Sequence, residues 1–122
     1  MGNKNFQCIR TQNVDGLTVV HFVDDKVMDP SRIELLGKEL AKLTEEESSP
    51  RLIVNFSDVK FFSSAAINKL IVLEKKVRAK GGQTRLTNLR PEVRDLFGFT
   101  HLDSLFTIHD SQEDAVVELN GK

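Results

Sequence analysis

Tryptophan and tyrosine are absent from this 122-residue sequence, and cysteine occurs once, as Cys8. A single cysteine cannot form an internal disulfide, which agrees with a reducing compartment. We expect Cys8 to act as a small buried apolar residue in the first strand rather than as a reactive thiol. Any aromatic anchor in a core or a binding surface must come from the eight phenylalanines.

Long apolar runs are also missing. No run approaches the roughly 20 residues that cross a bilayer, and residues 1–10 lack the apolar stretch of a signal peptide. We therefore expect a cytoplasmic protein without membrane insertion. The charge is balanced, with 17 basic and 18 acidic residues and no basic block. This balance argues against nucleic acid as a partner, because domains that bind nucleic acid neutralise its phosphates with a basic patch.

The motifs that commonly carry catalysis or hold cofactors are absent as well. The sequence has neither of the common glycine-rich phosphate loops and no nucleophile elbow. The three histidines, His21, His101 and His109, fall in different predicted elements, without the spacing of a metal site. We therefore expect no enzymatic activity, no cofactor and no bound metal.

The first third of the chain predicts a hairpin followed by a helix. Residues 6–11 alternate in polarity, residues 17–23 are β-branched and aromatic, and residues 13–16 supply turn chemistry. Asp29 and Pro30 suit the cap and the first position of a helix. The apolar stripe of this helix consists of Ile33, Leu36, Leu40 and Leu43.

The rest of the chain alternates strands and helices. Residues 51–56 form a compact apolar run, which is typical of a central strand covered on both faces. After a connection over residues 57–62, Ser63 or Ser64 can cap a helix with apolar residues Ala66, Ile67, Leu70, Leu73 and Val77, which stops at Gly81-Gly82. The last predicted elements are a strand at 83–87, a helix at 91–97, a strand at 102–108 and a helix, capped by Asp110 or Ser111, with Ala115, Val116 and Leu119 on one side.

The resulting order, ββαβαβαβα, indicates the α/β class. We expect a single-layer mixed sheet, mostly parallel, with an antiparallel hairpin strand at its edge and helices packed against it. No internal repeat or low-complexity segment interrupts the chain, so we expect one domain over residues 1–122.

The segment Phe61-Phe62-Ser63-Ser64-Ala65-Ala66-Ile67 combines two large aromatics, two hydroxyls and two small residues at the start of a predicted helix. The unpaired N–H groups at a helix start favour an acceptor oxygen or an anion, and small residues let another protein approach the backbone closely. A plain helix cap followed by alanines is the simpler interpretation of the same residues.

Two longer segments resemble the STAS family of anti-anti-sigma factors and related domains. One is residues 54–67, in which a buried strand, a short connection and the hydroxyl-rich helix start follow one another as in the family signature. The other is residues 86–106, where a short helix precedes a leucine-rich turn into the last strand. Together they extend the resemblance over nearly the whole chain.

The resemblance implies a partner-switching function. Family members of this type are anti-sigma factor antagonists. They bind an anti-sigma factor that is a serine kinase, until this kinase phosphorylates a Ser or Thr at the start of their second helix. Aligning Ile67 with the family leucine places Ala65 on the phosphorylated serine and Ala66 on a glycine. Either Ser64 or Ser63 is then phosphorylated instead, or the standard switch is lost, which the alanine favours. The predicted partner-binding residues are Asp58, Phe62, Ser63, Ser64, Ala65, Ala66 and Asn68.

Two other functions remain open at this level. One is a scaffold subunit of a stress-sensing STAS assembly, and the other is a STAS domain that senses a nucleotide or another small ligand. We expect a monomer or weak dimer whose main partner is a protein, an anti-sigma factor with serine-kinase activity or a similar regulator.

Overall fold

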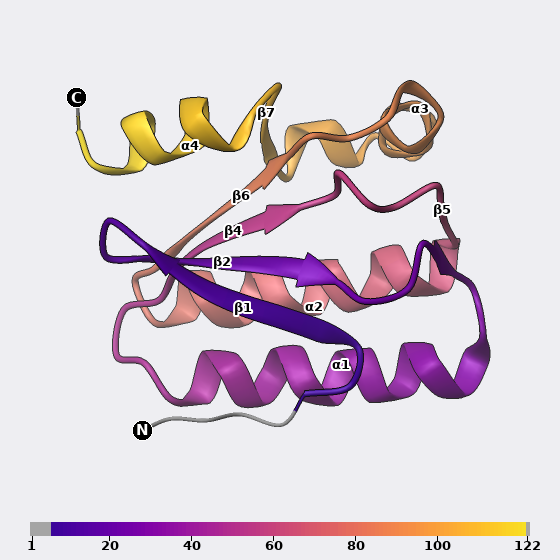
Figure 1. The fold of residues 1–122 in the computed structure, drawn as a ribbon, viewed down its shortest axis with the longest axis horizontal. Helices are drawn as coiled ribbons and strands as arrows, with labels where there is room; N and C mark the ends of the chain where they lie inside the picture. The colour runs from indigo at the N-terminus through magenta and orange to yellow at the C-terminus, as the bar shows by residue number, and fades with distance from the viewer. Residues whose placement is uncertain (1–5, 122) are drawn as a thin grey trace.

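The computed structural model describes residues 6–121, and its centre is a five-stranded β-sheet (Figure 1). The strand order is β1-β2-β4-β6-β7, with β1 antiparallel to β2 and the other neighbouring strands parallel. The strands span Ile9–Val14 (β1), Leu17–Phe22 (β2), Arg51–Asn55 (β4), Gln83–Thr87 (β6) and Thr107–His109 (β7). The predicted mixed, mostly parallel sheet with a hairpin strand at its edge is confirmed.

Helices lie on both faces of this sheet. Helices α1 (Pro30–Glu45) and α2 (Ser64–Ala79) lie side by side on one face, and α4 (Gln112–Leu119) lies on the other (Figure 1). Helix α3 (Pro91–Phe99) and a 3₁₀ helix, η1 (Leu102–Ser104), connect β6 to β7. Right-handed crossovers that advance in one direction place their helices on the same face. This rule explains why only α4, which follows the last strand, covers the other face.

The β1–β2 hairpin closes with a two-residue turn. Asp15 and Gly16 both have positive φ, of 51° and 82°, as the turns that match the twist of a hairpin require. The predicted turn over residues 13–16 was therefore too long, and the predicted strand at residues 6–11 was placed too early. The ladder needs only two turn residues, so pairing continues up to Val14 opposite Leu17.

Helix α1 begins where the cap residues predicted it. The Asp29 carboxylate accepts a hydrogen bond from the backbone N–H of Arg32 at 3.0 Å, and Pro30 is the first helical residue. All four residues of the predicted apolar stripe are buried between the helix and the sheet: Ile33, Leu36, Leu40 and Leu43.

Two hydrophobic cores flank the sheet. The larger core lies under α1 and α2 and contains a chain of five phenylalanine rings with successive centroids 5.2–6.2 Å apart: Phe22, Phe62, Phe56, Phe97 and Phe106. The smaller core lies under α4 and consists of Leu17, Val19, Ile53, Ala115 and Leu119. Because β4 contributes to both cores, the expectation of a central strand covered on both faces is confirmed.

Two parts of the predicted element order need correction. Residues 57–62 are not a plain connection, because β5 (Phe61–Phe62) pairs in parallel with β3 (Lys26–Val27) in a separate two-stranded sheet. The last strand does not begin at residue 102, since the N–H groups of Leu105 and Phe106 donate to the Leu102 carbonyl and close a 3₁₀ turn.

Candidate functional site

The start of α2 is built around the Ser63 side chain. Its hydroxyl oxygen accepts a hydrogen bond from the backbone N–H of Ala66 at 3.2 Å, so Ser63, and not Ser64, caps the helix. The Ser63 N–H donates to the carbonyl of Val27 at 3.0 Å, which fixes this end of α2 to strand β3.

The next residues of α2 divide between surface and core. Ser64, Ala65 and Asn68 are exposed, whereas Ala66 is buried against the sheet. Among residues 6–121, the Ser64 hydroxyl has no hydrogen-bond partner. This turn therefore offers a free hydroxyl, a small side chain and an amide to solvent, at the helix end that carries partial positive charge.

A shallow depression of about 380 Å³ lies beside this turn, between the first turns of α1 and α2. Ser63, Ala65 and Asn68, all predicted site residues, line it. The other lining residues are Met28, Pro30, Ile33, Glu34 and Lys69. The structure thus brings these three predicted residues together with a wall from α1 that the sequence analysis did not identify.

The small β3–β5 sheet sorts the two adjacent phenylalanines. Phe62 is 1% exposed and packs on Phe22 and Phe56 in the larger core, whereas Phe61 is 47% exposed. Met28, the residue after β3, is 54% exposed. Phe62 therefore supports the helix start from inside the fold, and the aromatic side chain available at the surface is Phe61.

Asp58 lies apart from the other predicted site residues. Its carboxylate is 3.8 Å from the Arg10 guanidinium on β1, and both side chains are mostly exposed. Ile9 enters the larger core, so Arg10, the next residue of the strand, points to the opposite face of the sheet. The Asp58 side chain therefore lies on the α4 side, whereas α2 lies on the other side.

The remaining ionisable candidates do not form a metal or catalytic cluster. Within residues 6–121, no group of three His, Cys, Asp or Glu side chains could hold a metal ion. Cys8 is buried one residue before β1, and burial raises the pKa of its thiol, partly offset by Arg32. Burial also lowers the pKa of His21, partly offset by Asp58. A buried thiol of raised pKa agrees with the apolar role expected of Cys8.

In the part of the chain that the structure describes, no helix is both long enough and apolar enough to span a membrane. This agrees with the lack of long apolar runs in the sequence.

Comparison with known proteins places the chain in a family. The STAS domain family model matches residues 9–115. BtrV of Bordetella bronchiseptica, which is named as an anti-sigma factor antagonist, is 26% identical over 84% of this chain and 85% of its own length.

Solved structures agree with this match. An anti-sigma-factor antagonist (STAS) domain protein from Planctomyces limnophilus superposes with a TM-score of 0.84 at 18% identity, covering 93% of this chain and 98% of that one. The anti-sigma factor antagonist SpoIIAA in its unphosphorylated form superposes with a TM-score of 0.77 at 20% identity, over 93% and 97% of the two chains. The chain belongs to the STAS domain family, within which it is similar to the anti-sigma factor antagonists.

Proposed function

We propose that this STAS domain binds an anti-sigma factor of the serine-kinase class and thereby releases the sigma factor that the kinase holds. The observation that carries the proposal is the exposed start of α2, where Ser64, Ala65 and Asn68 follow the exposed Phe61. Ala65 and Asn68 line the same depression as the exposed Met28. An apolar patch rimmed by polar groups is typical of a protein-binding surface. The name of the Bordetella relative supports the same role.

Binding alone accounts for this function, without a chemical step. The surface has small side chains at the helix start, so a partner can approach the backbone closely, and it has two exposed apolar side chains that a partner can bury. We infer that the domain works in the cytoplasm, because its kinase partner and the sigma factor act there. We also infer that residues 1–122 act as one domain.

The control of binding is part of the proposal. Ala65 stands where the family pattern places the phosphorylated serine, and an alanine cannot accept a phosphate. The domain therefore binds its partner without the standard switch. Ser64 is the neighbouring residue most open to a kinase, because its hydroxyl is exposed and unpaired among the described residues, whereas the Ser63 hydroxyl is engaged as the helix cap.

A phosphate at this turn would have a large effect on binding. It adds about 1.5 to 2 negative charges, and a charge buried without a partner in an interface costs about 2–5 kcal/mol. This range corresponds to a loss of affinity of roughly 30-fold to several thousand-fold. A domain that takes no phosphate at this turn would therefore stay competent to bind, whereas one added phosphate would be enough to break the complex.

The experiment begins with affinity capture from the native cytosol and identification of the captured proteins by mass spectrometry. Binding of the purified partner is then measured for Ala65→Glu, which should weaken it at least about tenfold, or about 1.4 kcal/mol. The matched control is Ala79→Glu, at the exposed far end of the same helix, which should bind as the wild type does. Unchanged binding by Ala65→Glu would place the interface elsewhere.

A second measurement tests the control of binding. Incubation with the captured kinase and ATP should add no phosphate at the start of α2, as measured by intact mass. One added phosphate that disappears in Ser64→Ala, but persists in Ser63→Ala, would show that the switch has moved to Ser64 and would refute its loss.

A further inference from the structure

A second surface adjoins the depression at the start of α2, with which it shares Glu34 and Lys69, and runs between α1 and α2 on the side away from the sheet. It is a groove of about 240 Å³ lined by residues of both helices: Glu34, Gly37, Lys38, Leu40 and Ala41 from α1, and Lys69, Val72, Leu73 and Lys76 from α2. The floor is apolar because the buried side chains of Leu40 and Leu73 line it. The residues at the closest approach of the two helices are small. A Cβ atom at Gly37 would lie 2.8 Å from Cδ of Lys69, so a larger residue there would displace the Lys69 side chain from its position across the groove.

The groove carries a positive charge that the fold does not neutralise. Lys69 pairs with Glu34 at 3.2 Å, but Lys38 and Lys76 have no ion-pair partner within residues 6–121. Helices α1 and α2 together contain seven basic and four acidic residues, although the whole chain has a net charge of −1. These two helices therefore carry net positive charge, and the rest of the molecule carries net negative charge.

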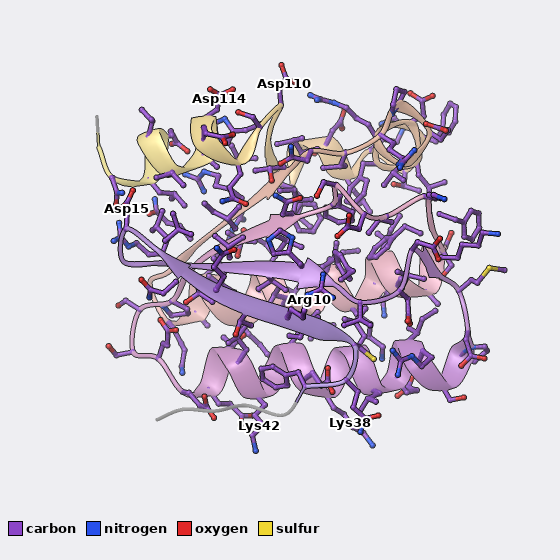
Figure 2. All side chains as sticks on the ribbon, in the orientation of Figure 1. Arg10, Asp15, Lys38, Lys42, Asp110 and Asp114 are labelled. Carbon is purple, nitrogen blue, oxygen red and sulfur yellow. The ribbon has the colours of Figure 1, made fainter. Side chains whose placement is uncertain are left out.

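The complementary surface is the outer face of α4. Its exposed residues are Glu113, Asp114, Val117 and Glu118, and Val117 is 50% exposed. Glu113 and Val117 are four residues apart and Asp114 and Val117 three, so the two carboxylates lie on the same side of the helix as the valine. In Figure 2, Asp110 and Asp114 project from one side of the molecule, and Lys38 and Lys42 project from the opposite side.

We propose that helix α4 of one copy docks into the α1–α2 groove of a second copy. Val117 then covers the apolar floor at Val72, and the carboxylates of Glu113 and Asp114 face the free ammonium groups of Lys38 and Lys76. A valine one helical turn beyond two acidic side chains matches a narrow apolar floor beside unpaired lysines. This charge complementarity favours a second copy as the occupant.

The contact is head to tail, because the two surfaces lie on opposite sides of the molecule. Each added copy leaves a free groove at one end of the assembly and a free α4 at the other, so the association is open-ended rather than a closed dimer. Eight helical residues span only about 12 Å, and stable interfaces need about 1,000 Å² or more. The association is therefore weak and sensitive to salt.

Sedimentation velocity on the full chain tests the proposal. The average sedimentation coefficient should rise between about 20 µM and about 1 mM protein at low salt, and the rise should disappear in about 1 M salt, where the screening length is about 3 Å. Two variants, Lys38→Glu/Lys76→Glu in the groove and Glu113→Lys/Asp114→Lys on α4, should each sediment as a monomer. The control Lys42→Glu/Lys75→Glu changes the same charges on α1 and α2 outside the groove and should associate as the wild type does.

Mixing the two monomeric variants tests whether the groove and α4 bind each other. The groove variant keeps an intact α4 and the α4 variant keeps an intact groove, and the reversed charges of the two variants are also complementary to each other. A mixture should therefore associate, although neither variant does so alone. Circular dichroism should show that both variants are folded.

A wild-type monomer at about 1 mM in low salt would overturn the proposal, and it is also the result expected if the groove takes an acidic helix of another protein. A mixture that does not associate, or a control that loses association, would overturn it as well. Binding of the anti-sigma factor is measured at the start of α2, so either proposal can fail without the other.

Discussion

The two faces of the sheet are held together by different interactions. On the α1–α2 side, buried aliphatic and aromatic side chains form the larger core, including the chain of five phenylalanine rings. On the α4 side, only five buried apolar residues form the core, and polar contacts surround it. Arg51 donates to the Leu119 carbonyl at 2.9 Å, and Asn55 donates to Gln112 at 2.8 Å.

Because of this difference, we expect the α1–α2 side to supply most of the stability and the α4 side to open more easily. Burial of apolar area supplies most of the free energy of folding, so the α1–α2 side should govern the unfolding transition. Exposed or half-exposed ion pairs contribute little by comparison. Helix α4 can therefore loosen without loss of the sheet, and the start of α2 rests on the more rigid core.

The largest effect is expected from the aromatic core. Phe62→Ala removes a ring that packs on both Phe22 and Phe56 and should lower the free energy of unfolding by about 3–5 kcal/mol. Phe61→Ala is the matched control in the adjacent position, because its side chain is half exposed; it should change stability by no more than about 0.5 kcal/mol. Urea denaturation followed by circular dichroism measures both. Equal losses in the two variants would contradict the assignment of Phe62 to the core.

A smaller effect is expected from the core under α4. Leu119→Ala should cost about 2–3 kcal/mol, at the lower end for a buried leucine, because the residue lies at the end of a short helix. Amide hydrogen exchange should become faster in α4 while α1 and α2 stay protected. Val117→Ala, on the exposed face of α4, is the control and should leave exchange unchanged. Faster exchange in all helices at once would show that the two faces unfold as one unit.

The long helices and the central strand could be predicted because local signals agree there with the fold. For α1, the Asp29 cap, Pro30 and the apolar stripe all indicate one start and one buried face. For β4, a run of apolar residues reflects burial on both sides. In each case the information lies within a few residues of the element, so the sequence alone was sufficient.

The elements that were missed depend on contacts between distant segments. Strands β3 and β5 have two residues each, which is too short for a period of two to be visible, and they form because residues 26–27 meet residues 61–62. The turn at Leu102 resembles a strand in composition, yet His101 has a φ of 59° and begins a 3₁₀ helix. Its leucines contact the larger core from this turn.

The candidate site shows the same division. The sequence located the helix start correctly, because Ser63 is a strong cap residue. It predicted Phe62 as a partner-binding residue, however, whereas Phe62 is 1% exposed and Phe61 is the phenylalanine at the surface. Alternation in β5 buries Phe62 and exposes Phe61. Asp58 is close to the site in sequence, but its carboxylate lies 3.8 Å from the guanidinium of Arg10 on β1, a contact between segments far apart in the sequence that no local pattern reveals.

The smallest effect is expected from the ion pairs of α4. The Glu118 carboxylate accepts hydrogen bonds from Arg85 at 2.6 and 3.1 Å and lies 3.1 Å from the ring of His109. Hydrogen bonding to Arg85 lowers the pKa of Glu118 from 4.5 to about 2. Because the folded-state pKa is the lower one, the folded state favours the charged form. The stability it contributes is present in full above pH 4.5 and is lost as the pH falls toward 2.

Glu118→Gln removes this contribution. At neutral pH the variant should be less stable than the wild type by no more than about 1 kcal/mol, because the carboxylate is about half exposed and solvent screens the pair. The difference between the two proteins should shrink as the pH falls from 4.5 toward 2, as measured by urea denaturation at successive pH values. Glu113→Gln, on the same helix and without an ion pair among the described residues, should show no such trend. A difference for Glu118→Gln that stays constant with pH would mean that packing of the side chain, rather than its charge, holds α4 to the sheet.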